Sequence, residues 1–154
     1  MSHNGQEIEA KFYVSNLDGI IARLHALQAR LVQSRVLETN LRFDLPNGEL
    51  RSKRQVLRLR HDTEARLTFK SSSQEQSGVL ARQEIEFVVE DFERARQFLH
   101  ALGYQEMIVY EKYRTTYKLT DALVMLDELP YGNFLEIEGV SVEQIQSAAT
   151  KLNL

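Results

Sequence analysis

The sequence predicts an α+β domain in which a mainly antiparallel sheet curls closed, with helices on its outer face. Three observations support this: eight segments with strand patterns, short turns between most of them, and charged residues at alternate positions on six strands. Strands that short turns join pair as antiparallel hairpins. The composition is 43% hydrophobic and 27% charged, and 154 residues are enough for one domain with its own core.

Composition also excludes several classes of protein. No stretch approaches the roughly 18 apolar residues of a membrane-spanning helix, and the first residues lack the charged-then-apolar pattern of a signal peptide. The absence of cysteine excludes disulfides, thiolate nucleophiles and cysteine metal sites. A net charge of −3 gives no basic field for nucleic acid. We therefore expect a cytoplasmic protein with neither a nucleic-acid nor a membrane partner, and we leave a homodimer open.

The strands follow from alternating or continuous apolar patterns between turn residues. They are predicted at residues 7–14, 32–45, 55–62, 65–72, 80–90, 106–120, 122–129 and 134–140, the segment 106–120 forming one strand or two. The sequence PNGE at 46–49 predicts a turn. The polar segment 71–78 predicts a mobile loop.

Three helices are predicted from apolar residues at helical spacing, over 15–31, 91–103 and 141–154. Each begins at a residue whose side chain can cap the first turn: Ser15 or Asn16, Asp91, and Ser141. Gly103 is expected to end the second helix.

Charged residues recur at alternate positions, beginning with Glu7, Glu9 and Lys11 in the sequence EIEAKF. Side chains of a strand alternate between two faces, so these three charges share one face. On a single strand this pattern is typical of a solvent-exposed face. On six strands, with positions that are almost all glutamate, arginine or lysine, it favours a charged face turned inward around a ligand.

The charged face predicts the chemistry of that ligand. Clustered carboxylates repel one another unless a hard divalent cation such as Mg²⁺ or Mn²⁺ lies among them. Buried cationic side chains need a highly charged anion. A metal-bound polyphosphate satisfies both sets. The acidic members are Glu7, Glu9, Glu84, Glu86, Asp127, Glu136 and Glu138, and the basic members are Lys11, Arg58, Arg60, Lys70, Arg82, Lys112 and Arg114.

An ordered set of motifs between residues 7 and 139 resembles the CYTH superfamily, also called triphosphate tunnel metalloenzymes. The motifs are EIEAKF, NLRFD, LRLR, LTFK, RQEIE, EKYR and LDELPYGNFLEIEG. The resemblance implies a single CYTH-like domain over residues 1–154. It also implies a closed eight-stranded antiparallel β-barrel, clad by helices, whose tunnel binds triphosphate and divalent metal. Members include class IV adenylyl cyclases, thiamine triphosphatases and inorganic tripolyphosphatases.

The resemblance also implies roles for individual residues. The metal ligands would be Glu7, Glu9, Asp127, Glu136 and Glu138, with Mg²⁺ or Mn²⁺ as the cofactor. The triphosphate contacts would come from Lys11, Arg58, Arg60, Lys70, Arg82, Lys112 and Arg114. Glu9 and Lys11 are the expected catalytic residues. Glu84 and Glu86 match the R-x-E-x-E strand, and their role stays open.

Three functions remain compatible with these residues. We favour metal-dependent hydrolysis of a small-molecule triphosphate, because no residue can be assigned to a base or sugar. In addition, Lys70 is followed by Ser-Ser-Ser where cyclase-like relatives have Gly-Pro. The first alternative is a class IV adenylyl cyclase that converts ATP to cyclic AMP and pyrophosphate. The second is a non-catalytic module that binds polyphosphate or nucleotides.

Overall fold

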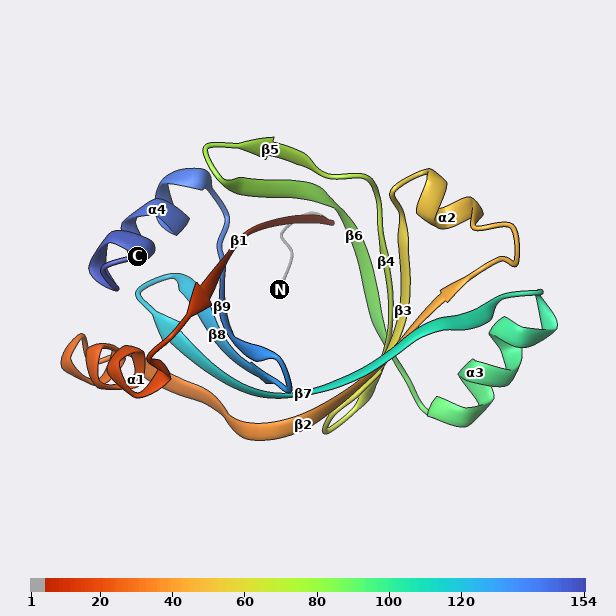
Figure 1. Ribbon diagram of the computed structural model, residues 1–154, viewed down its shortest axis with the longest axis horizontal. Helices are drawn as coiled ribbons and strands as arrows, with labels where there is room; N and C mark the ends of the chain where they lie inside the picture. Colours follow the sequence, from red (N-terminus) through yellow and green to blue (C-terminus); the bar gives the residue numbers. More distant parts are fainter. Residues whose placement is uncertain (1–4) are drawn as a thin grey trace. The chain divides into compact units, whose positions relative to one another are not determined.

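The computed structural model describes residues 5–154, which contain nine strands and four helices (Figure 1). The strands are β1 (Gln6–Val14), β2 (Arg30–Asp44), β3 (Val56–His61), β4 (Ala65–Lys70), β5 (Gln74–Gln76), β6 (Val79–Val89), β7 (Gln105–Leu119), β8 (Ala122–Leu129) and β9 (Gly132–Glu138). The helices are α1 (Leu17–Ala26), α2 (Glu49–Ser52), α3 (Phe92–Ala101) and α4 (Val142–Lys151). No helix in the described range is long and apolar enough to cross a membrane.

The strands form one sheet in the order β1-β9-β8-β7-β2-β3-β4-β6-β5. An additional pairing of β1 with β6 closes eight of these strands on themselves, while the three-residue β5 extends the sheet beside β6. Every pairing whose register is known is antiparallel. The predicted fold class, α+β with a closed eight-stranded antiparallel barrel, is therefore confirmed.

The chain divides into two compact units. Of the described residues, the first unit contains 5–36, 74–81 and 112–154, and the second contains 37–73 and 82–111. The long strands β2, β6 and β7 each contribute residues to both units.

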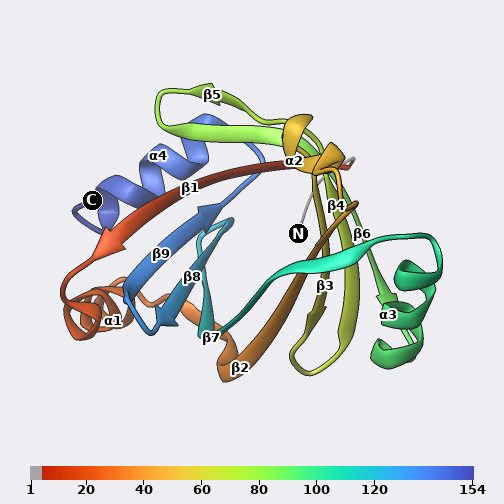
Figure 2. The same cartoon turned by 45° about the vertical axis from the view of Figure 1, so that its right-hand side comes forward.

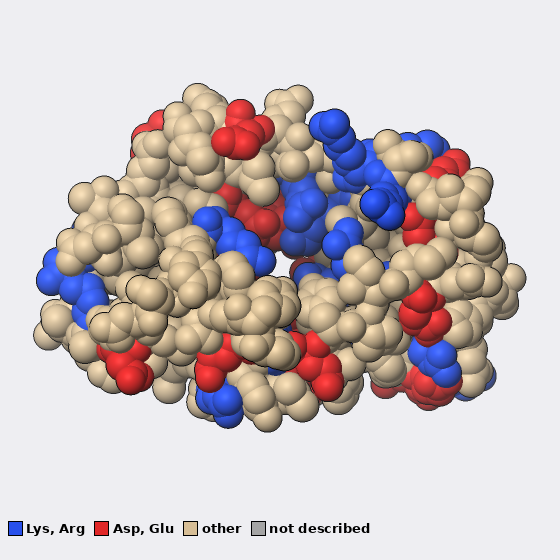
Figure 3. All heavy atoms as spheres, in the orientation of Figure 1, with Lys and Arg blue, Asp and Glu red and all other residues tan. Residues whose placement is uncertain are grey.

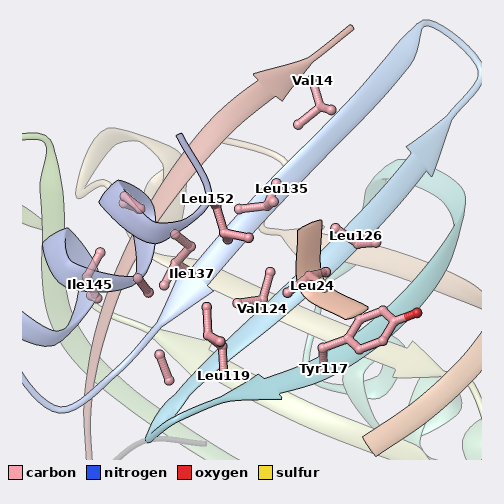
Figure 4. Close-up of a cluster of buried hydrophobic side chains, with 14 of the residues drawn as sticks. Val14, Leu24, Tyr117, Leu119, Val124, Leu126, Leu135, Ile137, Ile145 and Leu152 are labelled. Atoms are coloured by element: carbon pink, nitrogen blue, oxygen red, sulfur yellow. The ribbon is translucent and has the colours of Figure 1, made fainter. Parts of the chain in front are cut away.

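The core of the first unit lies between helices and the apolar face of its strands. Leu24 of α1 and Ile145 of α4 pack with Leu135 and Ile137 of β9, and all four side chains are almost completely buried. Figure 4 shows these side chains directed toward one another from the helices and strands of this unit. Burial of each such side chain contributes roughly 1.5–3 kcal/mol. This apolar packing leaves the opposite, charged face of the same strands outside the core.

The second unit has a smaller core, in which Leu99 of α3 packs against Leu59 of β3 and Phe43 of β2. Figure 2 shows α3 beside the strands of this unit, connecting the end of β6 to the start of β7. We expected helices to cover the apolar face of β6, but part of this face is exposed. Ile85 and Phe87 on it are 50% and 53% exposed. The buried strand residues of the cluster that includes Leu99 of α3 come from β2 and β3 instead.

The predicted caps of the helices agree with the structure, but the extent of the first helix does not. The side chains of Asn16, Asp91 and Ser141 each accept a hydrogen bond from a backbone N–H in the first turn of their helix. The prediction that the first helix reaches residue 31 is wrong. Gln28 has a φ of 57°, in the left-handed region, so the helix ends at Ala26 and β2 begins at Arg30.

Two short elements occur where only a turn and a loop were predicted. The segment 74–76 forms β5, which pairs with residues 79–81 of β6 and so closes a small hairpin. The short helix α2 begins at Glu49, the last residue of the predicted turn. It is held by the buried carboxylate of Asp44, which accepts hydrogen bonds from the backbone N–H groups of Leu45, Leu50 and Arg51 at 2.7, 2.9 and 3.1 Å.

Replacing Asp44 with asparagine is expected to lower the free energy of unfolding at pH 7 by about 1–3 kcal/mol. Burial alone would raise the pKa of Asp44, but the backbone N–H groups of Leu50, Arg51 and Leu45 outweigh it, so the pKa is lowered. The contribution is therefore present above the unfolded pKa of aspartate, about 3.9, and is lost as pH falls through the folded pKa. Urea denaturation at pH 7 and at about pH 2 measures it.

At about pH 2, the wild type and Asp44→Asn should have nearly the same free energy of unfolding. The control is Asp121→Asn, a change of the same kind at an exposed turn residue, which should leave stability almost unchanged at both pH values. Equal stability of Asp44→Asn and the wild type at pH 7 would contradict the assigned role.

Candidate functional site

The strands of the first unit place their charged residues on one shared face. Glu9 lies directly opposite Glu138, and Lys11 lies directly opposite Glu136, in the pairing of β1 with β9. Two residues directly opposite each other on neighbouring strands point to the same side of the sheet. Residues two positions apart on one strand also point to the same side. The predicted site residues on this face are Glu7, Glu9, Lys11, Lys112, Arg114, Asp127, Glu136 and Glu138.

Asp127 of β8 is the centre of an ion cluster in this unit. Its carboxylate accepts two hydrogen bonds from Arg114, Nε–Oδ1 at 2.6 Å and Nη2–Oδ2 at 2.7 Å. It also accepts one from Lys112, Nζ–Oδ2 at 2.9 Å. The Arg114 guanidinium reaches further, with Nη2 3.0 Å from Oε2 of Glu136. Because Asp127 is fully buried, its charge depends on these cations, and the cations are held in fixed positions in return.

Lys11 is the most accessible cation of this face. Its side chain is 53% exposed, and its ammonium lies 3.8 Å from Oε1 of Glu136. The same Nζ lies 5.0 Å from the centroid of the Phe134 ring. This loosely held ammonium can exchange its carboxylate partner for an anionic ligand at little cost, because exposed ion pairs contribute little.

The carboxylates near the start of β1 have the donor chemistry of a divalent metal site. Glu7 and Glu138 are buried, and Glu9 lies directly opposite Glu138. Like charges opposite one another destabilise a sheet, and a hard cation with oxygen ligands offsets that repulsion. Within residues 5–154, however, no group of three or more histidine, aspartate or glutamate side chains lies close enough to hold a metal. The carboxylate oxygens thus fit Mg²⁺ or Mn²⁺ by their chemistry, but the side chains of the described residues are not gathered into a metal-binding arrangement.

The second unit has a charged face of its own. Arg58 lies opposite Thr68, and Thr68 lies opposite Glu86, in consecutive pairings of β3, β4 and β6. Lys70 lies opposite Glu84 in the same way. Arg82 precedes Glu84 by two residues and so belongs to the same face. The predicted site residues here are Arg58, Arg60, Lys70, Arg82, Glu84 and Glu86.

Glu84 and Glu86, whose roles the sequence left open, contact the basic residues of this face. Glu84 and Lys70 are both buried and form an ion pair, with Nζ 3.5 Å from Oε2. Glu86 accepts a hydrogen bond from Arg60, with Nη2 3.0 Å from Oε1. These carboxylates hold the lysine and the arginine in defined positions on the sheet face. Figure 3 shows basic side chains (blue) gathered over the part of the molecule where the strands of this unit and α2 lie.

Two buried polar residues of β2 were not predicted as site residues. Glu38 is 1% exposed and Asn40 is fully buried, and the amide Nδ2 of Asn40 donates to Oε1 of Glu38 at 3.0 Å. Asn40 lies directly opposite Arg60, so both residues belong to the charged face. The sequence held a signal for them, because Glu38, Asn40, Arg42 and Asp44 alternate with less polar residues just as the residues of EIEAKF do.

Similarity to known proteins extends over almost the whole chain. Residues 5–152 match the CYTH domain family. A protein of Methanocaldococcus jannaschii, provisionally named an adenylate cyclase, is 28% identical over 134 residues, which are 86% of this chain and 75% of that protein.

Solved structures share the fold. A Vibrio parahaemolyticus protein, also provisionally named an adenylate cyclase, has a TM-score of 0.85 at 18% identity and covers 98% of this chain and 91% of its own. A Hippeastrum protein, provisionally named an adenylyl cyclase and described as having a dominant triphosphatase activity, has a TM-score of 0.74 at 20% identity. That likeness covers 94% of this chain and 84% of the Hippeastrum chain.

The family match includes every predicted site residue, from Glu7 to Glu138, and extends over residues of both compact units. The resemblance inferred from the ordered motifs is thereby confirmed. The chain belongs to the CYTH family.

Proposed function

We propose that this protein is a divalent-metal-dependent phosphohydrolase that acts on a small-molecule triphosphate: inorganic tripolyphosphate, thiamine triphosphate or a nucleoside triphosphate. One observation carries the proposal. Each unit holds cations in buried or half-buried positions on a strand face, and carboxylates of the same face keep them in place. Cations fixed in this way bind a polyanion with little further loss of side-chain entropy.

We assign the phosphate contacts to Lys11, Arg58, Arg60, Lys70, Arg82, Lys112 and Arg114. Arginine suits this task because its planar guanidinium donates two parallel hydrogen bonds to phosphate oxygens. Phosphoryl transfer needs positioning and neutralisation of charge more than covalent help from the protein. The fixed guanidinium groups would align the triphosphate chain, and the more exposed Lys11 would contact the phosphate that undergoes attack.

Glu7, Glu9, Asp127, Glu136 and Glu138 would hold Mg²⁺ or Mn²⁺, which supplies neutralisation of phosphate charge and activation of the nucleophile when bound. In the proposed reaction, water attacks the terminal phosphorus and the bond to its bridging oxygen breaks. Glu9 accepts the proton of the attacking water, and the diphosphate leaves with the bridging oxygen.

A second function, adenylate cyclisation, is favoured by the names of the M. jannaschii and V. parahaemolyticus relatives. In that reaction the ribose 3′-hydroxyl of ATP attacks the α-phosphorus, and pyrophosphate leaves. The charged residues assigned above suit either reaction. Hydrolysis remains our first proposal, because every assigned contact involves phosphate or metal and the related Hippeastrum protein is described with a dominant triphosphatase activity.

The decisive experiment offers ATP, thiamine triphosphate and tripolyphosphate separately with Mg²⁺ or Mn²⁺ and resolves the products by chromatography. We expect inorganic phosphate, released fastest from tripolyphosphate, because none of the contacts assigned above recognises a nucleobase or the thiamine group. Excess EDTA should abolish turnover, either metal should restore it, and Ca²⁺ should inhibit it. If cyclic AMP and pyrophosphate are the main products from ATP, the proposal of hydrolysis is wrong and the reaction is cyclisation. Tight binding of all three without turnover would instead favour a non-catalytic binding module.

A further inference from the structure

We infer that Glu38 is a positioning residue: its buried carboxylate, oriented by Asn40, fixes the guanidinium of Arg60 for contact with phosphate. The inference rests on the proposed function, because the phosphate contact of Arg60 is part of that proposal. Neither Glu38 nor Asn40 was among the residues predicted from the sequence.

Carboxylates from two strands lie beside two different nitrogens of the Arg60 guanidinium, one in a hydrogen bond and the other in a longer ion pair. Its Nη2 donates to Glu86 of β6 at 3.0 Å, and its Nη1 lies 3.9 Å from Oε2 of Glu38 on β2. The arginine side chain is 12% exposed. An arginine side chain has many rotamers, and contacts on both terminal nitrogens restrict both the position and the plane of the guanidinium.

Glu38 is itself held in a defined orientation. A buried carboxylate is stable only with polar partners, and one of them is the amide of Asn40, which donates to Oε1 at 3.0 Å. The other carboxylate oxygen, Oε2, is the one that faces Arg60. Asn40 lies directly opposite Arg60 across the pairing of β2 with β3. Asn40, Glu38 and Arg60 thus form a short chain of contacts that ends at a proposed phosphate-binding group.

This arrangement is not the one that stability alone would favour. Among the described residues, Oδ1 of Asn40 and Nε of Arg60 are buried and have no hydrogen-bond partner. Such unsatisfied atoms are costly, and a buried network kept in spite of that cost calls for a functional reason. A carboxylate near a phosphate site also repels the anion. The benefit that offsets both costs is the fixed orientation of Arg60.

The first test compares Glu38→Gln with the wild type. Glutamine keeps the size of the side chain and an oxygen that can accept from Asn40, but it removes the charge that faces Arg60. We expect kcat/KM for tripolyphosphate to fall 10- to 100-fold, because a misplaced contact group weakens the transition state at this scale. The matched control is Glu64→Gln in the same unit, where the glutamate side chain is 51% exposed, and kcat/KM should stay within twofold.

A double-mutant cycle separates positioning from a structural role. If Glu38 acts through Arg60, then Glu38→Gln should have almost no further effect on kcat/KM in an Arg60→Ala background. If Glu38 only supports the fold, the two effects should multiply. Multiplying effects, or a Glu38→Gln variant with wild-type kcat/KM, would overturn the inference. Glu38→Asp keeps the charge at shorter reach and should recover part of the lost activity.

The double-mutant cycle is repeated with the Kd of tripolyphosphate, measured by calorimetry without metal. Because binding is measured without turnover, this version tests the inference separately from the proposed function. If the wild type binds tripolyphosphate but hydrolyses no triphosphate, the proposed hydrolase function is refuted. The double-mutant cycle measured by Kd still decides the role of Glu38 in that case. A wild type that neither binds nor hydrolyses refutes both.

Discussion

Replacing Asp127 with asparagine is expected to lower the free energy of unfolding by about 3–5 kcal/mol, the usual cost of removing one partner of a buried ion pair. Asp127 is fully buried, and three hydrogen bonds of 2.6–2.9 Å join it to Lys112 and Arg114. The substitution removes the negative charge closest to both cations. Thermal and urea denaturation without ligand should show this loss, with a fall in melting temperature of roughly 10 °C.

Tripolyphosphate should recover part of that stability. The proposed ligand replaces the missing negative charge, and a ligand that binds only the folded state stabilises it by mass action. The ligand-induced rise in melting temperature should therefore be at least as large in Asp127→Asn as in the wild type. A matched control on the same strand is Glu128→Gln, which affects the exposed pair with Arg35 and should cost less than about 1 kcal/mol. A ligand-free Asp127→Asn protein as stable as the wild type would contradict the assigned role of the cluster.

Replacing Glu9 with glutamine is expected to reduce kcat for the best triphosphate substrate by about 10²–10⁴-fold. The substitution removes a proposed metal ligand and the proposed acceptor of the proton, while the basic residues that bind phosphate stay in place. The Kd of tripolyphosphate measured by calorimetry should therefore change by less than about fivefold. Interactions made only in the transition state affect kcat, and those made with the bound substrate affect Kd.

The control for this change is Glu75→Gln on β5, an exposed position of the same unit, where both constants should stay near the wild-type values. Two results would count against the role of Glu9: turnover within tenfold of the wild type, or a loss of tripolyphosphate binding as large as the loss of turnover. The second result would place Glu9 among the groups that build the binding face.

Local patterns in the sequence were enough to predict most of the elements. The alternation in EIEAKF correctly placed Glu7, Glu9 and Lys11 on one face of β1, because alternation follows from strand geometry alone. The caps Asp91 and Ser141 were predicted because a cap depends on a hydrogen bond across only three residues. The motifs together were sufficient to identify the family.

Other features were decided by contacts between residues that lie far apart in the chain. The first helix carries apolar residues at helical spacing as far as Leu31, yet it ends at Ala26, where the chain turns into β2. The helical spacing of Leu31 was therefore misleading, since tertiary pairing overrides local propensity. In the same way, the segment 74–76 becomes a strand only because β6 lies beside it.

The partners of each charge are the clearest case of a feature that only the tertiary structure decided. Alternation predicted that Glu86 and Arg60 each lie on the charged face of a strand, but Arg60 lies 26 residues from Glu86 in the chain and contacts it at 3.0 Å. Whether a carboxylate binds metal or positions an arginine depends on which strands pair and in which register. Pairing and register are set by the packing of the whole sheet. The sequence by itself therefore determined which predicted charges share the face of one strand, and only the fold determined what each of them contacts and that Glu38 and Asn40 belong to the same charged face.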